Sequence, residues 1–441
     1  MRVFEIIGPV MVGPSSSHTA GAVRIGLAAR EALGEAVEQA KIELHGSYAA
    51  KAEGHHTDLA LVAGLLGMDT DDERIKHSFA IAAQQGMKYT FVKTDLGPGT
   101  HINSARLTVQ GAHRRAQIVA SSLGGGRIVV THRDGKQVPP VSHEAGRDEP
   151  CYERVDALVQ RAQRENCSIG HVALCDEALA AGESQAQSLA RMQAMLEVMR
   201  HSVQEGERAE SETQSGMVCA EGHAIKHAME QKKLPDDLLH VTLQKALSAA
   251  TANACMGCIV AAPTAGACGI LAGVLLAAQQ CEGYADAALC EALFAAGALG
   301  MVVAQRSTLS GSQGGCQVEC GVGGGMAAAA LTQLRGGTPQ QVADAFAIAL
   351  KSALGLVCDP VAGLVEVPCV KRNGNYAAVA LSSSAMAIAG LNSFIPPDEV
   401  IDAMDMVGSH IDPTLRCTDT GGLAGTPTAQ RTLHQIFGEK D

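Results

Sequence analysis

The sequence predicts an α+β protein, in which an N-terminal mixed α/β domain precedes a larger all-helical domain. Alternation of apolar and polar residues, which is typical of half-buried strands, occurs in the first third of the chain. Long Ala- and Leu-rich segments with helical period fill the remainder. A polar stretch containing Pro139 and Pro140 separates the two patterns. We therefore expect an α/β domain at 1–135, a linker at 136–151 and a helical domain at 152–441.

The first domain is expected to combine short strands with a helix. Residues 41–48 (KIELHGSY) and 105–110 alternate apolar and polar side chains. Residues 117–120 and 127–131 indicate a further strand pair around a turn of three glycines. Apolar residues at helical spacing predict a helix over 20–33.

The second domain is expected to be helical throughout. Several segments are apolar on every face, which places them centrally in a bundle. The predicted helices cover 152–165, 174–205, 238–256, 268–281, 285–305, 324–335, 338–354, 376–391 and 397–408. The stretch between Lys245 and Glu282 carries no charge and is long enough to span a bilayer. Because Pro263 interrupts it and its ends lack a basic flank, we expect a loop between two buried helices.

The composition narrows the function classes. Of 441 residues, 46% are hydrophobic and 18% charged, which indicates a well-buried globular protein. The net charge of −12 argues against nucleic acid or an anionic membrane as a partner. The N-terminus lacks the features of a signal peptide, so we expect a cytoplasmic protein. The chain has fourteen cysteines, and cysteines of cytoplasmic proteins rarely form disulfides. A homodimer is the default assembly.

Two segments of the first domain are rich in reactive side chains. Residues 13–19 (GPSSSHT) precede a predicted helix, where hydroxyls and free N–H groups suit a carboxylate or phosphate. The alternative is an ordinary N-cap with spare serines. The adjacent His55 and His56 suit a general base or a metal ligand. Since neighbouring residues point in different directions, a single catalytic histidine is the favoured functional interpretation, with a surface or capping role as the alternative.

A third group of candidates is the cysteines of the helical domain. Cys316, Cys320, Cys358 and Cys369 each lie close to Gly or Pro, which favours helix ends over helix interiors. Helix ends expose N–H groups that can donate to thiolates or sulfides. Spacing alone does not identify an iron–sulfur site, because distant ligands follow no local motif. Ordinary buried thiols are the alternative.

The pair Cys255 and Cys258 forms a C-x-x-C motif with its own interpretation. Together with Cys316 and Cys320 it could make a four-thiolate zinc site, or it could be a redox pair. The apolar local composition, without nearby Lys or Arg, disfavours both.

Several segments together resemble the iron–sulfur-dependent L-serine dehydratases. In the first domain these are IIGPVMVGPSSSHTAGAVRIG and GSYAAKAEGHHTDLALVAGLLG. In the second they are MGCIVAAPTAGACGIL, SGSQGGCQVECG, LGLVCDPVAGLVEVPCVKRN and GGLAGTPT. The resemblance covers nearly the whole chain, with the β-type part before the α-type part.

The resemblance implies a [4Fe-4S] cluster held by Cys316, Cys358 and Cys369, with Cys320 as a packing neighbour. Three ligands leave one iron open to act as a Lewis acid. The implied reaction is dehydration and deamination of L-serine, a small-molecule amino-acid substrate, to pyruvate and ammonia. No nucleic acid and no membrane takes part.

The resemblance also implies roles in the first domain. His55 aligns with the family's Gly-His segment and is the expected general base. The expected substrate-binding residues are Ser15, Ser16, Ser17, His18, His101 and Asn103.

The chain departs from the family pattern at several positions. His56 replaces a usual Gly, Cys258 a usual Arg, and Cys417 a frequently acidic residue. The segment 215–227 also differs, which bears on substrate identity. A related substrate, such as threonine, cysteine or a hydroxylated amino acid, is therefore the alternative to serine.

Overall fold

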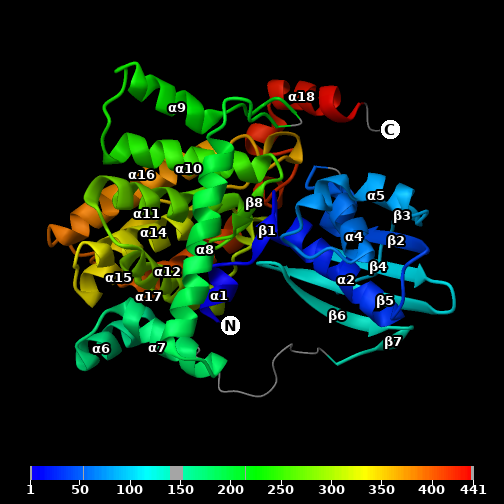
Figure 1. Cartoon of the computed structure of the whole chain (residues 1–441), viewed down its shortest axis with the longest axis horizontal. Coiled ribbons are helices and arrows are strands. Elements are labelled where there is room, and N and C mark those ends of the chain that lie inside the picture. Colours follow the sequence, from blue (N-terminus) through cyan, green and yellow to red (C-terminus); the bar gives the residue numbers. More distant parts are fainter. Residues whose placement is uncertain (1, 53, 140–151, 214, 439–441) are drawn as a thin grey trace. The chain divides into compact units, whose positions relative to one another are not determined.

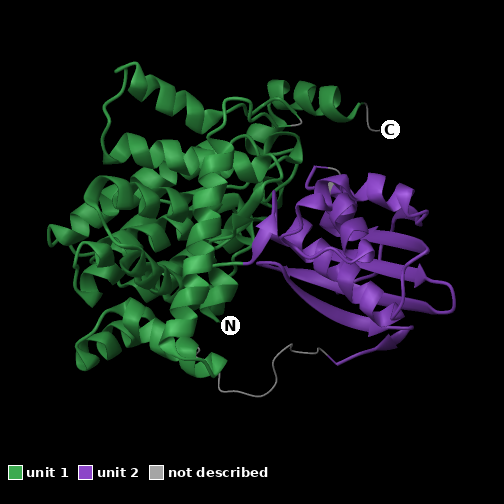
Figure 2. Ribbon diagram, viewed as in Figure 1, with its two compact units in different colours: residues 1–8, 147–441 green, residues 9–146 purple. Residues whose placement is uncertain are grey.

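The computed structural model describes residues 2–52, 54–139, 152–213 and 215–438. The chain forms two compact units, shown in Figure 2. The α/β unit comprises Pro9–Gly146, and the helical unit comprises Met1–Gly8 and Arg147–Asp441. Of the expected linker, 140–151 lies outside the described residues.

The α/β unit is built on a six-stranded mixed sheet with the order β3-β2-β4-β5-β6-β7. The pair β2 and β3 is parallel, and the other neighbours are antiparallel. The strands are β2 (Gln39–His45), β3 (Lys88–Lys93), β4 (Asn103–Gln110), β5 (Arg115–Gly124), β6 (Arg127–Arg133) and β7 (Lys136–Gln137). The expected strands are therefore present. Strand β3 is additional, and so is β7, which lies at the start of the expected linker. The prediction that 41–48 is a single strand is wrong at its end, because Gly46 (φ 58°) turns the chain into α3 (Gly46–Lys51).

Two helices of this unit cross at glycines. The helices are α2 (Gly21–Leu33), which matches the prediction, and α4 (Thr57–Leu66). A Cβ on Gly26 would lie 2.5 Å from the carbonyl oxygen of Leu61, and a Cβ on Gly64 would collide with that of Val23. The backbones therefore approach as closely as only glycine allows. Shorter elements are β1 (Val10–Val12), η1 (Ser16–Ala20), η2 (Glu73–His77) and α5 (Ser78–Gln84).

The helical unit confirms the predicted fold class. Its longer helices are α6 (Val155–Glu165), α7 (Ile169–Ala181), α8 (Gln185–Gly206), α9 (Glu221–Glu230), α10 (Leu238–Ala254), α11 (Cys268–Glu282), α12 (Asp286–Arg306), α14 (Cys320–Leu334), α15 (Pro339–Lys351), α16 (Cys369–Ile388), α17 (Pro397–His410) and α18 (Pro427–Phe437). The predicted helix 174–205 is two helices, because Gly182 adopts a left-handed cap (φ 67°) and Ser184 caps the next helix. Helices α9 and α18 were not predicted.

The uncharged stretch behaves as the core of this unit. The segments Ala265–Glu282 and Asp286–Arg306 are long and apolar enough to cross a membrane. Yet 72% and 78% of their most apolar 18-residue stretches are buried inside the protein. Figure 1 places α11, α12 and α14 among the other helices of the unit. A loop with β8 (Cys258–Val260) joins α10 to α11, as expected. Burial of this extent is typical of core helices.

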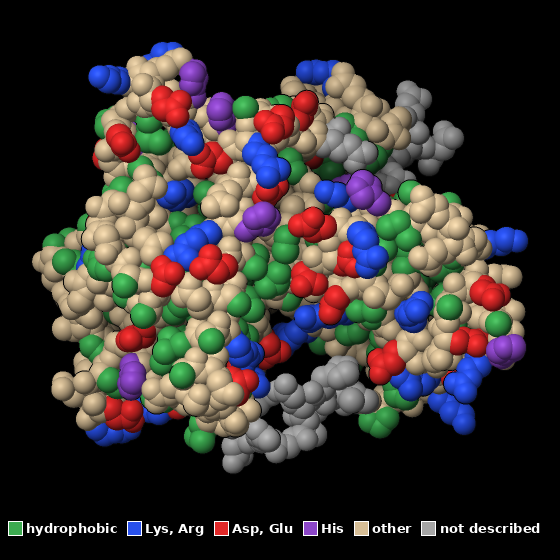
Figure 3. Space-filling model, in the orientation of Figure 1, with side chains coloured by type: hydrophobic (Ala, Val, Ile, Leu, Met, Phe, Trp, Pro, Cys, Tyr) green, Lys and Arg blue, Asp and Glu red, His purple; other side chains and the backbone are tan. Residues whose placement is uncertain are grey.

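Acidic and basic side chains are interspersed over the face shown in Figure 3. Among the described residues, ion pairs include Arg306 with Asp402 at 2.6 Å and Arg335 with Glu282 at 2.6 Å.

Candidate active-site residues

The serine-rich segment of the α/β unit forms a π-helical turn. Ser15 is the N-cap of η1, and its hydroxyl accepts the N–H of His18 at 3.2 Å. The turn leads directly into α2. Ser15 and Ser17 stay partly exposed, whereas Ser16 and His18 are buried. The capping role of Ser15 is therefore real, and it leaves the other hydroxyls of this turn for further contacts. Single π-turns often mark functional sites.

His18 is held by hydroxyls at both ring nitrogens. Its Nε2 lies 2.9 Å from the Ser47 Oγ, and its Nδ1 lies 3.3 Å from the Ser17 Oγ. The ring also faces that of His55, with centroids 4.4 Å apart and an interplanar angle of 62°. The two predicted histidines therefore lie side by side.

His55 and His56 occupy different environments. His55 is 3% exposed, and its backbone carbonyl accepts the Thr19 hydroxyl at 3.0 Å. His56 has a left-handed backbone (φ 53°) and stands at the N-cap position of α4. Burial lowers the pKa of His56. His55 thus contacts the serine turn, while its neighbour begins a helix.

His101 and Asn103 join the same group through Ser47. The N–H of Ser47 donates to the carbonyl of Ile102 at 2.7 Å. The Asn103 N–H donates to the His101 Nδ1 at 3.2 Å, and burial lowers the pKa of His101. Asn103 is 1% exposed, and within the described part of the chain its Oδ1 accepts no hydrogen bond. A buried unsatisfied acceptor is rare and favours a site for a donor such as an ammonium group.

Sequence reasoning missed two residues of this group, Ser47 and Tyr48. The Tyr48 hydroxyl donates to the carbonyl of Ser17 at 2.8 Å, and burial raises the pKa of Tyr48. Both residues lie in the family-like segment GSYAAKAEGHHT. The prediction of a single strand over 41–48 obscured these contacts. A strand places neighbouring side chains on opposite faces, so Ser47 and Tyr48 were not expected to contact the same turn.

The cysteine site is the second candidate, in the helical unit. We use this name for Cys316, Cys320, Cys358, Cys369 and Cys417. The sulfurs of Cys316 and Cys320 are 3.5 Å apart. Cys320 and Cys369 are the first residues of α14 and α16, and Cys316 opens the short turn η4 (Cys316–Val318). These three occupy helix starts, as expected, where N–H groups are free. The same expectation is wrong for Cys358, which lies outside a helix in an isolated bridge with Arg416.

The thiols of this site do not ionise equally. The hydrogen bond with the Cys320 thiol, and next the Arg372 guanidinium, lower the pKa of Cys316 to about 7 against the opposing effect of burial. The hydrogen bond with Cys316 raises the pKa of Cys320, and a hydrogen bond with Cys417 raises that of Cys358. Burial raises the pKa of Cys369. Within the site, the pKa of Cys316 is therefore lowered, while those of Cys320, Cys358 and Cys369 are raised.

Arg372 is the cation of the site. It donates to Asp359 Oδ1 at 2.8 Å and to the carbonyl of Val357 at 3.0 Å. The side chains of Arg372 and Asp359 are 13% and 4% exposed. Burial lowers the pKa of Arg372, but Cys316 and Asp359 raise it by more. The guanidinium therefore stays charged beside the thiols.

A carboxyl group completes the cysteine site. Burial, and next the charges of Cys316 and Cys417, raise the pKa of Glu319 well above its usual range. A Cβ on Gly311 would collide with Glu319 Oε2 and lie 3.4 Å from the Cys358 sulfur. Gly311 in the family-like SGSQGGC segment is therefore required by a close approach of these two groups.

The family-like segment GGLAGTPT packs onto the same site. The N–H of Leu423 donates to Asp359 Oδ2 at 2.8 Å. Gly422 has φ 58°, and a Cβ there would lie 2.5 Å from the same oxygen. Asp359 thus joins Arg372 to this C-terminal segment.

The thiols named for the disfavoured zinc alternative have different neighbours. The charged neighbours of Cys255 are Glu366, Cys219 and Glu212, whereas those of Cys316 are at the cysteine site. Among the residues that the structure describes, no group of three or more His, Cys, Asp or Glu side chains converges on a single metal ion. Cluster ligands bind different irons, so they need not converge in this way.

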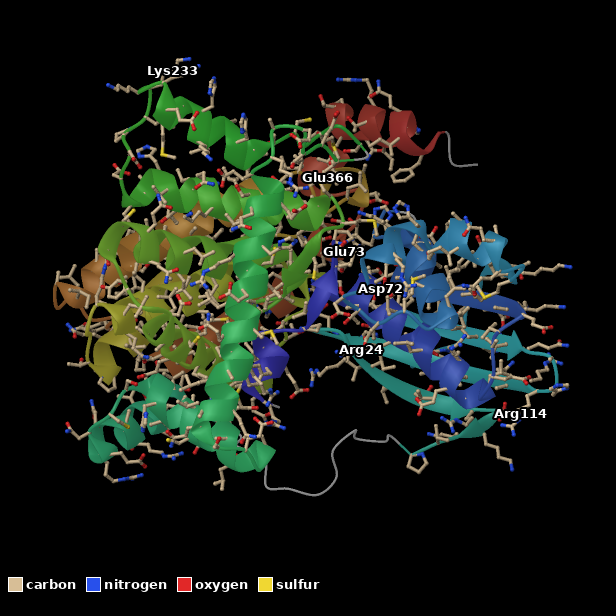
Figure 4. All side chains as sticks on the ribbon, in the orientation of Figure 1. Arg24, Asp72, Glu73, Arg114, Lys233 and Glu366 are labelled. Carbon is tan, nitrogen blue, oxygen red and sulfur yellow. The ribbon has the colours of Figure 1, made fainter. Side chains whose placement is uncertain are left out.

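The unusual segment 215–227 is anchored beside Cys369. The hydroxyls of Ser215 and Thr213 both donate to Glu366 Oε2, Thr213 at 2.6 Å. Burial raises the pKa of Glu366, which is labelled in Figure 4, and these hydrogen bonds oppose the shift. Val218 packs against Val370 in a small apolar cluster. The segment therefore contacts the residues that flank a predicted ligand.

The fold and these residues define a two-part enzyme, with hydroxyls and imidazoles in an α/β unit and buried thiols in a helical unit. Residues 2–133 match the family described as "Serine dehydratase beta chain", and residues 164–424 match "Serine dehydratase alpha chain". The chain belongs to the serine dehydratase family.

Its relatives match over nearly their full lengths. "L-serine dehydratase 2" of Escherichia coli is 32% identical over 464 aligned positions, covering 96% of this chain and 98% of the relative. "L-serine dehydratase" of Mycobacterium bovis is 31% identical over 462 positions, covering 96% and 97%. "Probable L-serine dehydratase, alpha chain" of Bacillus subtilis is 41% identical over 290 residues, covering 65% of this chain and 96% of the relative.

Proposed function

We propose that this protein dehydrates and deaminates L-serine to pyruvate and ammonia with a [4Fe-4S] cluster. The family and the names of the full-length relatives support the substrate. The observation that carries the cofactor is the gathering of Cys316, Cys358 and Cys369 with the Arg372 guanidinium. The enzyme is expected to work in the cytoplasm as a homodimer.

The chemistry of the cysteine site fits such a cluster. Cys316, Cys358 and Cys369 would hold it, because thiolates are the usual ligands of iron–sulfur clusters. Bound iron would place positive charge beside the Cys358 and Cys369 thiols, and positive charge favours the thiolate form. N–H groups at the starts of α14 and α16 are available to donate to sulfur. When bound, the cluster supplies a Lewis-acidic iron that polarises the β-hydroxyl of the substrate.

The α/β unit supplies the acid–base groups. His55 is the proposed base that removes the α-proton of serine. Its backbone is fixed by Thr19, and its ring is flanked by that of His18. The Ser47 and Ser17 hydroxyls hold the His18 ring in turn.

The serine turn and its neighbours are proposed to bind the substrate. Hydroxyls of the segment containing Ser15, Ser16 and Ser17 suit the carboxylate. The unsatisfied oxygen of Asn103 suits the ammonium group, with His101 beside it.

The reaction balances without an oxidant or an organic cofactor. Loss of the α-proton and of the β-hydroxyl removes one water and leaves an enamine. Its tautomer is an imine, which takes up one water and yields pyruvate and ammonia.

A second candidate is the same reaction on threonine, cysteine or a hydroxylated amino acid. The observation that favours it is the contact of the unusual segment 215–227 with Glu366 and Val370, on either side of Cys369. A change there can alter the space available to a β-substituent.

The test uses protein purified without oxygen. We expect a brown protein that contains iron and sulfide, releases pyruvate from L-serine, and loses colour and activity together in air. Cys358→Ser should remove both, whereas Cys281→Ser, at an exposed cysteine of α11, should keep both. A colourless protein that takes up no iron and sulfide would refute the cofactor. A brown protein that acts on threonine or another amino acid but not on serine would favour the second candidate.

A further inference from the structure

Helix α7 carries a separate group of metal-binding side chains that neither the cysteine site nor the histidines of the α/β unit include. Cys167, His171 and Cys175 recur at every fourth residue in the sequence CSIGHVALC. This interval is close to one turn of an α-helix, so side chains at this spacing lie on one face. Cys167 precedes the N-cap Ser168, and the other two residues lie within the helix. Ligand pairs at this spacing are typical of zinc sites on helices.

The His171 ring and the Cys175 thiol have the separation of two ligands of one ion. The His171 Nε2 lies 3.5 Å from the Cys175 Sγ. Bonds of about 2.3 Å to sulfur and about 2.0 Å to nitrogen, at a tetrahedral angle, place the two ligand atoms about 3.5 Å apart. The same contact also suits a hydrogen bond between the thiol and the ring, which an ion would replace. The distance between the two atoms therefore needs no change when an ion binds.

Neighbouring groups orient both side chains. The His171 N–H donates to the Oγ of the N-cap Ser168 at 2.9 Å, and the Ser168 hydroxyl donates to Glu291 of α12. The Gln185 Nε2 donates to the Cys175 Sγ at 3.3 Å. Hydrogen bonds of this kind around metal ligands hold them in the orientation that the ion requires.

The electrostatic surroundings of Cys175 favour a cation. The charged groups that act on this thiol include Asp176, Glu165, Glu291 and Arg161. The guanidinium is already engaged, since it donates to both oxygens of Asp176 at 2.6 and 2.9 Å and to Glu165 at 2.9 Å. Burial, and next the charge of Asp176, raise the pKa of Cys175. Negative charge at this place disfavours a free thiolate and attracts a bound cation.

We propose that His171 and Cys175 form a binding site for a thiophilic divalent cation such as Zn²⁺. The ligands are the His171 Nε2 and the Cys175 thiolate. Within the described part of the chain no third His, Cys, Asp or Glu side chain converges with them, so water completes the coordination. As the Zn–S bond forms, the thiol proton passes to solvent, and no electron is transferred. The inference does not rest on the proposed function, because none of these residues belongs to the sites that it uses.

The first experiment measures zinc binding by equilibrium dialysis of the reconstituted protein. It compares wild type with His171→Ala, with Cys175→Ser and with Cys281→Ser, a control at the exposed cysteine of α11. Zinc bound elsewhere on the chain is common to these proteins and cancels in the comparison. We expect wild type and the control to retain about one zinc per chain more than the other two variants.

Two results of this experiment would overturn the inference. One is equal zinc content in all four proteins, which would mean that His171 and Cys175 bind none. The other is a loss of the same size in Cys281→Ser, because zinc would then be bound by exposed thiols in general.

A second measurement uses wild type alone, so it does not depend on how the variants fold. Iodoacetamide is applied with and without zinc, and the alkylation of each cysteine is scored by mass spectrometry. We expect zinc to slow the alkylation of Cys175 several-fold and to leave that of the exposed Cys281 unchanged. Equal alkylation rates at Cys175 with and without zinc would refute ligation.

Discussion

Replacing Asp359 with alanine tests whether the buried pair with Arg372 holds the cysteine site together. The change removes the carboxylate that Arg372 contacts at 2.8 Å and the acceptor of the Leu423 N–H. Both side chains of the pair are nearly buried, at 4% and 13% exposed. The variant therefore leaves a guanidinium without its carboxylate and removes one of the contacts that hold the segment after Cys417.

The expected loss of stability is large. Removing one partner of a buried ion pair costs about 3–5 kcal/mol. Because the Cys316 thiolate still faces Arg372, we expect the lower end of this range, about 3 kcal/mol in the free energy of unfolding. The matched control is Asp402→Ala, since Asp402 pairs with Arg306 at the surface and is 55% exposed. That change should cost less than about 1 kcal/mol.

Urea unfolding, followed for the helical unit, measures both variants. Hydrogen exchange provides a local readout, because the Leu423 amide should lose its protection in Asp359→Ala but not in Asp402→Ala. If the two variants lie within about 1 kcal/mol of each other, the pair does not stabilise the site and the reasoning fails.

Three further predictions follow from the same residues. Ser47→Ala removes the hydroxyl at the His18 Nε2, so kcat/KM for serine should fall by about 10- to 100-fold. Ser47→Thr keeps a hydroxyl and should restore much of the loss. Unchanged kinetics in Ser47→Ala would refute a positioning role. Because the folded state raises the pKa of Glu366, its protonated form contributes stability below the unfolded value of 4.5 that is lost as pH rises. Glu366→Gln should therefore gain stability relative to wild type as pH increases in urea titrations, and a stability difference that stays constant with pH would contradict this. If the proposed cluster is present, chelation of iron should lower the thermal midpoint of the helical unit, because a ligand that binds the folded state stabilises it; an identical midpoint with and without chelator would contradict this.

Local sequence pattern was sufficient to predict the fold class and most elements. Apolar residues at helical spacing identified α2, α10, α12 and α17 to within a few residues, because burial of one face repeats along the chain. Helix α9 was missed because its sequence, EGHAIKHAME, has few large apolar residues, and Gly222 is its one buried residue. The break at Gly182 was missed because a single cap residue interrupts two patterns of the same period.

The candidate residues were predicted mostly from segments that resemble a family, since no spacing rule connects them. The sequence by itself determined the residue types: hydroxyls and histidines in the first domain and thiols near glycine or proline in the second. Only the tertiary structure decided which of them meet. It placed Ser47 on His18, separated His55 from His56, and brought Cys417 to Cys358. The physical reason is that the buried face of a helix or strand repeats at a regular spacing along the sequence, whereas contacts between distant segments depend on how the whole chain packs.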